Sequence, residues 1–234
     1  MASLHTRVTD DVGRSIVDGT VPAGTILLSD EIERRQGVSR SVIREAIRVL
    51  GSMGLVESVK RVGIRVLPSE SWNAYDPTII RWRLLGPGKG EQLRSLTELR
   101  SAVEPMAAEL AARHAAPTVA AELVGVAELM RSAGDSGDLS QFLELDIRFH
   151  QLVLQGSGNQ MFAKLDEPVA AVLSGRTDLG LMPDRPHENT LQLHADVATA
   201  IAGGDPGAAR VAMELIMRRT YAEVQPSWSR ASGQ

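Results

Sequence analysis

The segment from residue 28 to residue 67 constrains this chain most, because two short helical patterns there are followed by two short strand patterns. Gly37 can adopt the positive φ of a tight turn that ends a helix over residues 30–36. Ser39 stands at the N-cap of a second helix over residues 40–52, where its hydroxyl can accept from free amides. The segment therefore predicts two helices joined by a tight turn.

The second predicted helix has an apolar face and a polar face. Its apolar residues, from Val42 to Leu50, recur at helical spacing. The N-terminal half of such a helix meets base edges and phosphates in the DNA major groove, and arginine can donate to both O6 and N7 of guanine. The candidate DNA-contacting residues on its polar face are Arg40, Ser41, Arg44 and Arg48.

Residues 55–59 and 63–67 predict two short strands, with Lys60 and Arg61 at the turn between them, where a basic tip contacts phosphates. Residues 1–67 hold 10 basic and 8 acidic residues, a net +2, and the rest of the chain holds 15 and 21, a net −6. This asymmetry has the sign expected for a DNA-binding segment. Two alternatives are that the arginines only solvate a helix face, or that the winged helix contacts protein.

Residues 8–66 resemble the winged helix-turn-helix of the GntR family of bacterial regulators, through VPAGTILL, GVSRSVIREAIRVLGSMGLV and VGIRV. The resemblance implies that Arg40, Ser41 and Arg44 contact bases and phosphates. This chain departs from the family pattern at three positions. Leu27 replaces the usual proline, Asp30 the usual basic or polar residue, and Gln36 the frequent aromatic residue.

Length and composition agree with a DNA-binding domain followed by a helical one. The chain has 234 residues, 43% of them hydrophobic, which supports more than one core. No apolar stretch approaches the ~20 residues of a membrane span, and no signal peptide is evident. The absence of cysteine excludes disulfides and thiolate metal sites and fits a cytoplasmic protein.

The fold class predicted is mostly α: a winged helix-turn-helix over residues 1–67, a linker rich in Pro, Ser and Asn over 68–77, an antiparallel helical bundle over 78–226, and a tail over 227–234. Short loops separate the amphipathic segments of the bundle. Its predicted helices are 78–85, 90–115, 117–133, 139–156, 160–174, 187–202 and 206–224.

The residues of the bundle that could carry chemistry are polar residues on the buried faces of its helices. Asp146 lies on the apolar stripe of helix 139–156, and His150 follows one turn later. His194 and Arg100 lie on the inward faces of two other helices. Buried carboxylates need partners, so these residues form either a core ion-pair network or a binding site.

Oxygen and imidazole ligands without sulfur suit Zn, Ni, Mn or Fe(II), so Asp146, His150 and His194 are candidate metal ligands. Three protein ligands leave coordination positions for water or a small anion. Arg100 can donate two hydrogen bonds to a ligand carboxylate. The further candidates at the rim of such a pocket are Arg148, Arg176 and Thr177.

Residues 78–224 resemble the FCD effector domain of the FadR subfamily, through ELRSAVEPMAAELAA, LELDIRFHQLVLQGSGN and LHADVATAIAGGDPGAA. The resemblance implies a divalent metal on Asp146, His150 and His194 and a small organic acid beside Arg100. Ile216 stands where the family usually has its last histidine. The segment SWNAYDPTIIRWRLL resembles regulators of sugar-acid catabolism, which favours an acid such as galactonate or gluconate.

These observations predict a homodimeric transcriptional regulator, commonly a repressor, that binds an inverted repeat of double-stranded DNA and responds to an acid. One alternative is a metal-dependent hydrolase or lyase fused to a DNA-binding domain, because Asp/His/His centres also hold catalytic metals. The sequence lacks HExxH, a nucleophile elbow and a phosphate-binding glycine loop. Another alternative is a DNA-binding protein without a ligand.

Overall fold

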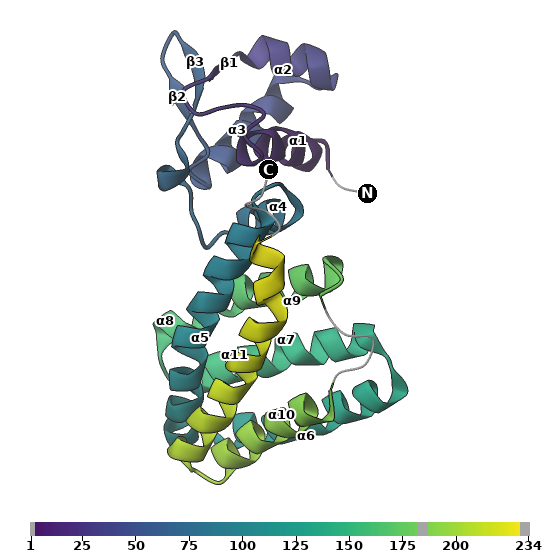
Figure 1. The fold of residues 1–234 in the computed structure, drawn as a ribbon. Helices are drawn as coiled ribbons and strands as arrows, with labels where there is room; N and C mark the ends of the chain where they lie inside the picture. The colour runs from purple at the N-terminus through teal and green to yellow at the C-terminus, as the bar shows by residue number, and fades with distance from the viewer. Residues whose placement is uncertain (1–2, 182–186, 230–234) are drawn as a thin grey trace. The chain divides into compact units, whose positions relative to one another are not determined.

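A computed structural model describes residues 3–181 and 187–229 of the chain, apart from the side chains of residues 227 and 229. The backbone divides into two compact units, Met1–Gly88 and Lys89–Gln234. The described residues form eleven α-helices and one small three-stranded sheet (Figure 1). The predicted fold class, mostly α with an N-terminal winged helix followed by a helical domain, is confirmed.

The first unit contains the predicted helix-turn-helix and wing. Its sheet is antiparallel with the strand order β1-β3-β2, and Val56 pairs with Val66 across the wing. The three helices surround a core of apolar side chains that includes Ile43, Leu50 and Leu55. The elements are α1 (Leu4–Val17), β1 (Ile26–Leu27), α2 (Ser29–Gln36), α3 (Arg40–Ser52), β2 (Val56–Val59) and β3 (Gly63–Val66).

The turn between α2 and α3 forms for the predicted backbone reason. Gly37 has a φ of 63°, and its amide donates to the Glu33 carbonyl at 2.9 Å, which ends α2. Ser39 has the extended backbone of an N-cap, but its hydroxyl makes no capping bond. It lies 2.9 Å from the hydroxyl of Ser41 instead, so the predicted side-chain cap of α3 is wrong.

Helix α1 was not predicted, although its sequence carries a signal. Ser3 caps the helix by accepting from the Thr6 amide at 3.3 Å. Val8, Val12 and Ile16 recur every four residues and are buried in the core of the unit. This stripe packs against α3.

Helix α4 (Pro77–Leu85) packs against α1 through Trp82. Asp76 caps α4, and the Trp82 indole donates to the Asp10 carboxylate at 3.2 Å. The indole is 1% exposed and lies over Gly13 of α1. The two compact units therefore separate after Gly88, whereas the sequence predicted a linker over 68–77 and grouped residues 78–85 with the bundle.

The second unit is all α, and its long helices pack along one another in pairs that include α5 with α11, α10 with α11, and α6 with α7. Among the described residues, no helix combines the length and apolar content that a membrane crossing requires. The helices are α5 (Lys89–His114), α6 (Pro117–Ser136), α7 (Leu139–Gly156), α8 (Gln160–Ala163), α9 (Asp166–Asp178), α10 (Glu188–Ala202) and α11 (Pro206–Ser229).

The helix predicted over residues 160–174 is two helices, α8 and α9. Pro168 stands in the first turn of α9, where a missing amide leaves no hydrogen bond unmade. Helix α11 runs to Ser229 and includes Pro226, whereas the sequence predicted its end near residue 224. Thr220 and Glu223, which lie within the predicted part of α11, reach the polar cavity described below.

The contact between α1 and α4 can be tested at Gly13. A Cβ added to Gly13 would lie 2.2 Å from the Trp82 ring, so Gly13→Ala is expected to destabilise the first unit by about 1–3 kcal/mol. Gly51→Ala is the matched control, because its Cβ would lie 3.6 Å from the Val56 carbonyl oxygen, an ordinary contact distance, and alanine favours helix. Urea melts should show a lower midpoint for Gly13→Ala only. Equal midpoints would mean that Trp82 does not pack on α1.

Candidate functional site

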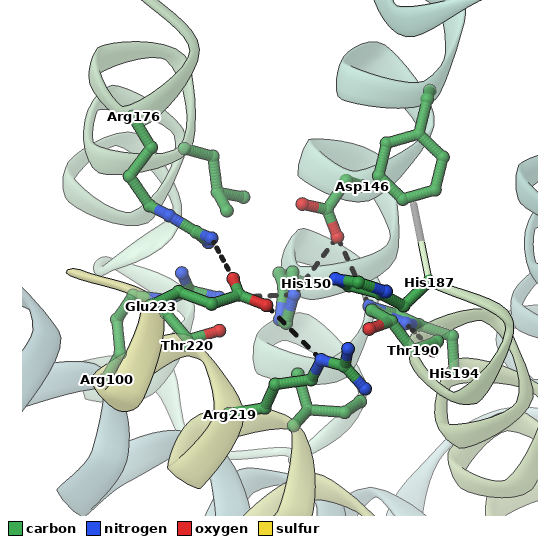
Figure 2. A pocket seen from close by; sticks show the side chains of 13 residues that line it. Arg100, Asp146, His150, Arg176, His187, Thr190, His194, Arg219, Thr220 and Glu223 are labelled. Carbon is green, nitrogen blue, oxygen red and sulfur yellow. Dashed lines mark hydrogen bonds and ion pairs between the residues drawn. The ribbon is translucent and has the colours of Figure 1, made fainter. Parts of the chain in front are cut away.

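A polar cavity lies inside the second unit, among helices α5, α7, α9, α10 and α11 (Figure 2). Its volume is about 40 Å³, room for about three water molecules. Apolar side chains form part of its wall, including Phe142, Leu173 and Ile216. The polar residues that line it are Arg100, Asp146, Arg176, His150, His187, Thr190, His194, Arg219, Thr220 and Glu223.

The apolar stripe of α7 carries Asp146 and His150 into the core. Both residues lie on the same face as Phe149, which is fully buried. The Phe149 ring packs edge-on against His150 and against His194 of α10, with centroid distances of 5.8 and 4.9 Å. The imidazoles are therefore held by the packing of the core as well as by their polar partners.

Asp146, His150 and His194 converge on one point. Oδ1 of Asp146 lies 3.4 Å from Nε2 of His150 and 3.2 Å from Nε2 of His194. One ligand atom from each residue lies within 4.8 Å of the other two. Two ligand atoms at zinc-binding distances and the tetrahedral angle are about 3.4 Å apart, so the spacing fits a shared divalent ion.

Buried partners orient His150 from behind. Nδ1 of His150 lies against the Glu104 carboxylate, which also accepts from Nε of Arg100 at 2.6 Å. Nη2 of Arg100 lies 3.2 Å from Nε2 of His150, and arginine can only donate. The neutral ring that fits these contacts is protonated at Nδ1 and has a lone pair at Nε2.

His194 is also protonated at Nδ1, with its Nε2 turned to Asp146. Its Nδ1 lies 2.8 Å from the carbonyl oxygen of Thr190, which can only accept, so Nδ1 carries a proton. The buried Nε2 makes no hydrogen bond within the described residues. Both imidazoles thus present Nε2 to Asp146 while an acceptor engages Nδ1, as is usual for histidines that bind metal.

The charges of this cluster shift one another's protonation. Burial raises the pKa of Asp146, but the imidazoles of His150 and His194 beside its carboxylate outweigh it and hold the pKa well below its usual value. Burial also opposes ionisation of Glu104, whose pKa is nevertheless lowered to about 2 by Arg100 and His150. For His150, burial lowers the pKa, but the charge of Glu104 and the proximity of both carboxylates raise it above its usual value. Both carboxylates are charged at neutral pH.

A second charged cluster lines the cavity. The Glu223 carboxylate accepts from Nη2 of Arg176 at 3.0 Å through one oxygen and from Nε of Arg219 at 3.2 Å through the other. Figure 2 shows this carboxylate between the two guanidinium groups. Burial, and then the charge of Arg100, lower the pKa of Arg176.

The structure brings the predicted residues Asp146, His150, His194, Arg100 and Arg176 to one cavity. Arg148 and Thr177 are not among the described residues that line the cavity. The Arg148 guanidinium pairs with Glu122 on α6, and the Thr177 hydroxyl bonds the Leu173 carbonyl at 3.4 Å. The structure therefore does not place these two residues at the pocket rim, where the sequence predicted them. Ile216 does line the cavity and is 3% exposed.

Several polar residues in or beside the cavity were not predicted from sequence. Glu104 was detectable, because it follows Arg100 by four residues on the same helix face and can share its environment. Arg219 and Glu223 have the same spacing on α11, but that helix carries other exposed pairs of the kind, such as Arg210 and Glu214. Spacing alone does not distinguish the pair that faces a cavity.

The predicted DNA-contacting residues of α3 are all exposed. Arg40 is paired with Asp30 and Glu33 of α2, each at 3.3 Å, and Arg48 lies 3.8 Å from Glu45. Arg44 has no carboxylate partner within the described residues. Arg44 and Arg48 line a groove between α3 and the wing that also contains Ser58.

Lys60 and Arg61 are exposed at the tip of the wing, in the turn between β2 and β3. Arg61 has a φ of 65°, a left-handed conformation that is uncommon for a residue with a Cβ. The predicted basic residues are thus exposed on α3 and at the wing tip.

Comparison with known proteins identifies both halves. Residues 4–66 match the family of bacterial regulatory proteins named gntR, and residues 95–219 match the FCD domain. The galactonate operon transcriptional repressor of Escherichia coli K12 is 30% identical over 219 residues, which cover 92% of this chain and 94% of that protein. A probable D-xylose utilization operon transcriptional repressor of Paenarthrobacter nicotinovorans is 27% identical, with 90% and 84% covered.

Solved structures show the same fold. E. coli McbR/YncC aligns with a TM-score of 0.56 and 20% identity over 97% of this chain and all of that one. These families consist of regulators, so the alternative of a metal-dependent enzyme is not supported. With a GntR winged helix, an FCD domain and a relative at 30% identity over nearly its whole length, the chain belongs to the GntR family of transcriptional regulators.

Proposed function

We propose that this protein is a transcriptional repressor whose helical domain binds a divalent metal and a small carboxylic acid, and that the acid alters its grip on operator DNA. The observation that carries the proposal is the convergence of Asp146, His150 and His194, with both Nε2 atoms turned to one carboxylate oxygen. One relative is the galactonate operon transcriptional repressor, and another is a probable repressor of a D-xylose utilization operon. The first supports a sugar acid such as galactonate or gluconate as the effector.

Asp146, His150 and His194 would hold the ion, and their donor set of two nitrogens and one oxygen favours Zn, with Ni, Mn or Fe(II) as further candidates. When bound, the ion supplies positive charge that attracts a carboxylate. Ile216 contributes no ligand atom from its side of the cavity. Coordination positions therefore remain for water or for oxygens of the acid, and Arg100 lies beside them to donate to a carboxylate.

Regulation requires that the acid discriminate between two states of the protein. The family relationship supports a homodimer in which two α3 helices read the halves of an inverted repeat. The acid would favour a state with weaker DNA binding. Because its DNA target lies there, we expect the protein to act in the cytoplasm. A ligand-independent DNA-binding protein would have no use for a buried charged cavity, whose groups are costly to desolvate.

Arg44 tests the DNA-binding half. After selection of an operator from a random duplex library with the parent protein, Arg44→Ala is expected to weaken binding by about 1–3 kcal/mol, roughly 5- to 150-fold. Arg113→Ala removes an equal charge from an exposed arginine of α5 and should bind operator as the parent does. Fluorescence anisotropy at fixed salt would measure both. Parent-like affinity of Arg44→Ala would refute the assignment of α3 as the reading helix.

The metal centre can be tested by chelation and titration. The chelated protein is expected to bind one equivalent of zinc, with a rise in melting temperature. His194→Ala should lose at least about 100-fold in zinc affinity, because it deletes one of three ligands. His114→Ala, an exposed histidine at the end of α5, is the control. If calorimetry shows no zinc binding by the parent, the cluster is an ion-pair network and the metal proposal fails.

Glu104 supports the site indirectly and has its own test. Its pKa falls from 4.5 to about 2 on folding, so Glu104→Gln is expected to destabilise the chelated protein by about 3 kcal/mol at pH 7. A lowered carboxyl pKa adds stability that is complete above pH 4.5 and is lost as the pH falls toward 2. The difference from the parent should therefore shrink in acid.

Zinc affinity should fall about 10- to 100-fold in Glu104→Gln, because the amide orients His150 less firmly. Glu98→Gln is the matched control, since Glu98 forms an i,i+4 pair with Arg94 on the same helix but is 56% exposed. Its stability should stay within about 0.5 kcal/mol of the parent. A Glu104 variant with unchanged stability and zinc affinity would contradict the role assigned to this carboxylate.

A further inference from the structure

Glu223 stands out among the carboxylates of the cavity because it is the most accessible one. Its side chain is 28% exposed, against 7% for Asp146 and 1% for Glu104. Each of its oxygens accepts one hydrogen bond from a cavity arginine. Glu223 can thus leave its position by side-chain rotation, whereas the other two carboxylates are enclosed by the core.

Two arginines of the cavity have donor atoms without an acceptor, although each arginine also has a carboxylate partner. Arg100 pairs with Glu104, and Arg176 pairs with Glu223. Nη1 of Arg100 and Nε of Arg176 are buried and have no hydrogen-bond partner among the described residues. A buried donor without an acceptor is destabilising, so the cavity is built to hold a further anionic or oxygen-rich group.

Arg176 cannot be left without a counter-charge. Its side chain is 5% exposed, and an unpaired buried guanidinium would strongly destabilise the unit. Glu223 supplies that charge from α11, tethered within hydrogen-bond distance. A tethered carboxylate has an effective concentration in the millimolar range or above, so it competes strongly with any carboxylate from solution.

We propose that Glu223 is a resident carboxylate in a second anion position on Arg176 and Arg219, and that it restricts the cavity to acids with a single carboxylate. The proposal rests on the proposed binding of an acid in this cavity and specifies its class. A monocarboxylic acid places its carboxylate at Arg100 and the Asp–His triad and its neutral end toward Glu223. A dicarboxylic acid brings a second negative charge against the Glu223 carboxylate and is rejected.

Removing the charge of Glu223 should open the second position to a carboxylate from solution. The experiment is a thermal melt in chelator, with sodium acetate titrated against sodium chloride at equal ionic strength. Glu223→Gln is expected to bind acetate about tenfold more tightly than the parent. Glu214→Gln is the matched control, because Glu214 accepts from Nε of Arg210 at 3.0 Å in the same i,i+4 arrangement on α11. It should respond as the parent does.

Equal acetate responses of parent and Glu223→Gln would overturn the proposal. If the Gln variant does not fold, Glu223→Ala carries the same test, because it also removes the carboxylate and leaves space beside Arg176 and Arg219. Adding Arg176→Gln should abolish the gained response, and a response that persists would place acetate elsewhere and refute the assignment. The assay contains no metal, so a failure of zinc binding would count against the proposed function without affecting this result.

The selectivity itself can be measured with two six-carbon acids that differ at one end, gluconate with one carboxylate and glucarate with two. In the zinc-loaded protein, Glu223→Gln should shift the ratio of their affinities toward glucarate by at least about tenfold. An unchanged ratio would mean that Glu223 does not select between the two classes.

Discussion

Asp146 is a carboxylate buried in the middle of a helical bundle, and the polar interior of the second unit is arranged around it. A lone ion there would be several kcal/mol unfavourable. Two imidazoles from α7 and α10 face one of its oxygens, and their own outer nitrogens are engaged by Glu104 and by a backbone carbonyl. Arg100 then balances Glu104. Each charge is tolerated because the next one is present, so these helices can pack closely only with the whole set in place.

Such interdependence explains how much of the site the sequence revealed. Asp146 and His150 were predictable because α7 has a regular apolar stripe, and a charged residue on it must point inward. The partner of Arg176 was not, because Glu223 comes from α11, and only the fold brings that helix to α9. Arg148 shows the opposite failure, since it adjoins the site in sequence but projects toward α6.

The fold was predictable to a similar degree and for similar reasons. Turn glycines and apolar periodicity identified α2, α3 and most of the bundle, because these signals are local. Helix α4 was grouped with the bundle, since a segment rich in Pro, Ser and Asn precedes it and resembles a linker. What places α4 with the first unit is the contact of Trp82 with Gly13, two residues far apart in the sequence. The lack of a side chain at Gly13 of α1 indicates a packing site only when its partner, Trp82, is known.

The ion pairs that Arg40 forms with acidic residues of α2 affect how strongly DNA binding depends on salt. To reach a phosphate, Arg40 must exchange Asp30 and Glu33 for it, so this contact replaces one ion pair with another. Contacts from unpaired cations release counterions and make affinity fall steeply with salt, by a slope of about 0.9 per phosphate. An arginine already neutralised in the free protein adds less to that slope. Binding by this regulator should therefore be less sensitive to ionic strength than its number of basic residues implies.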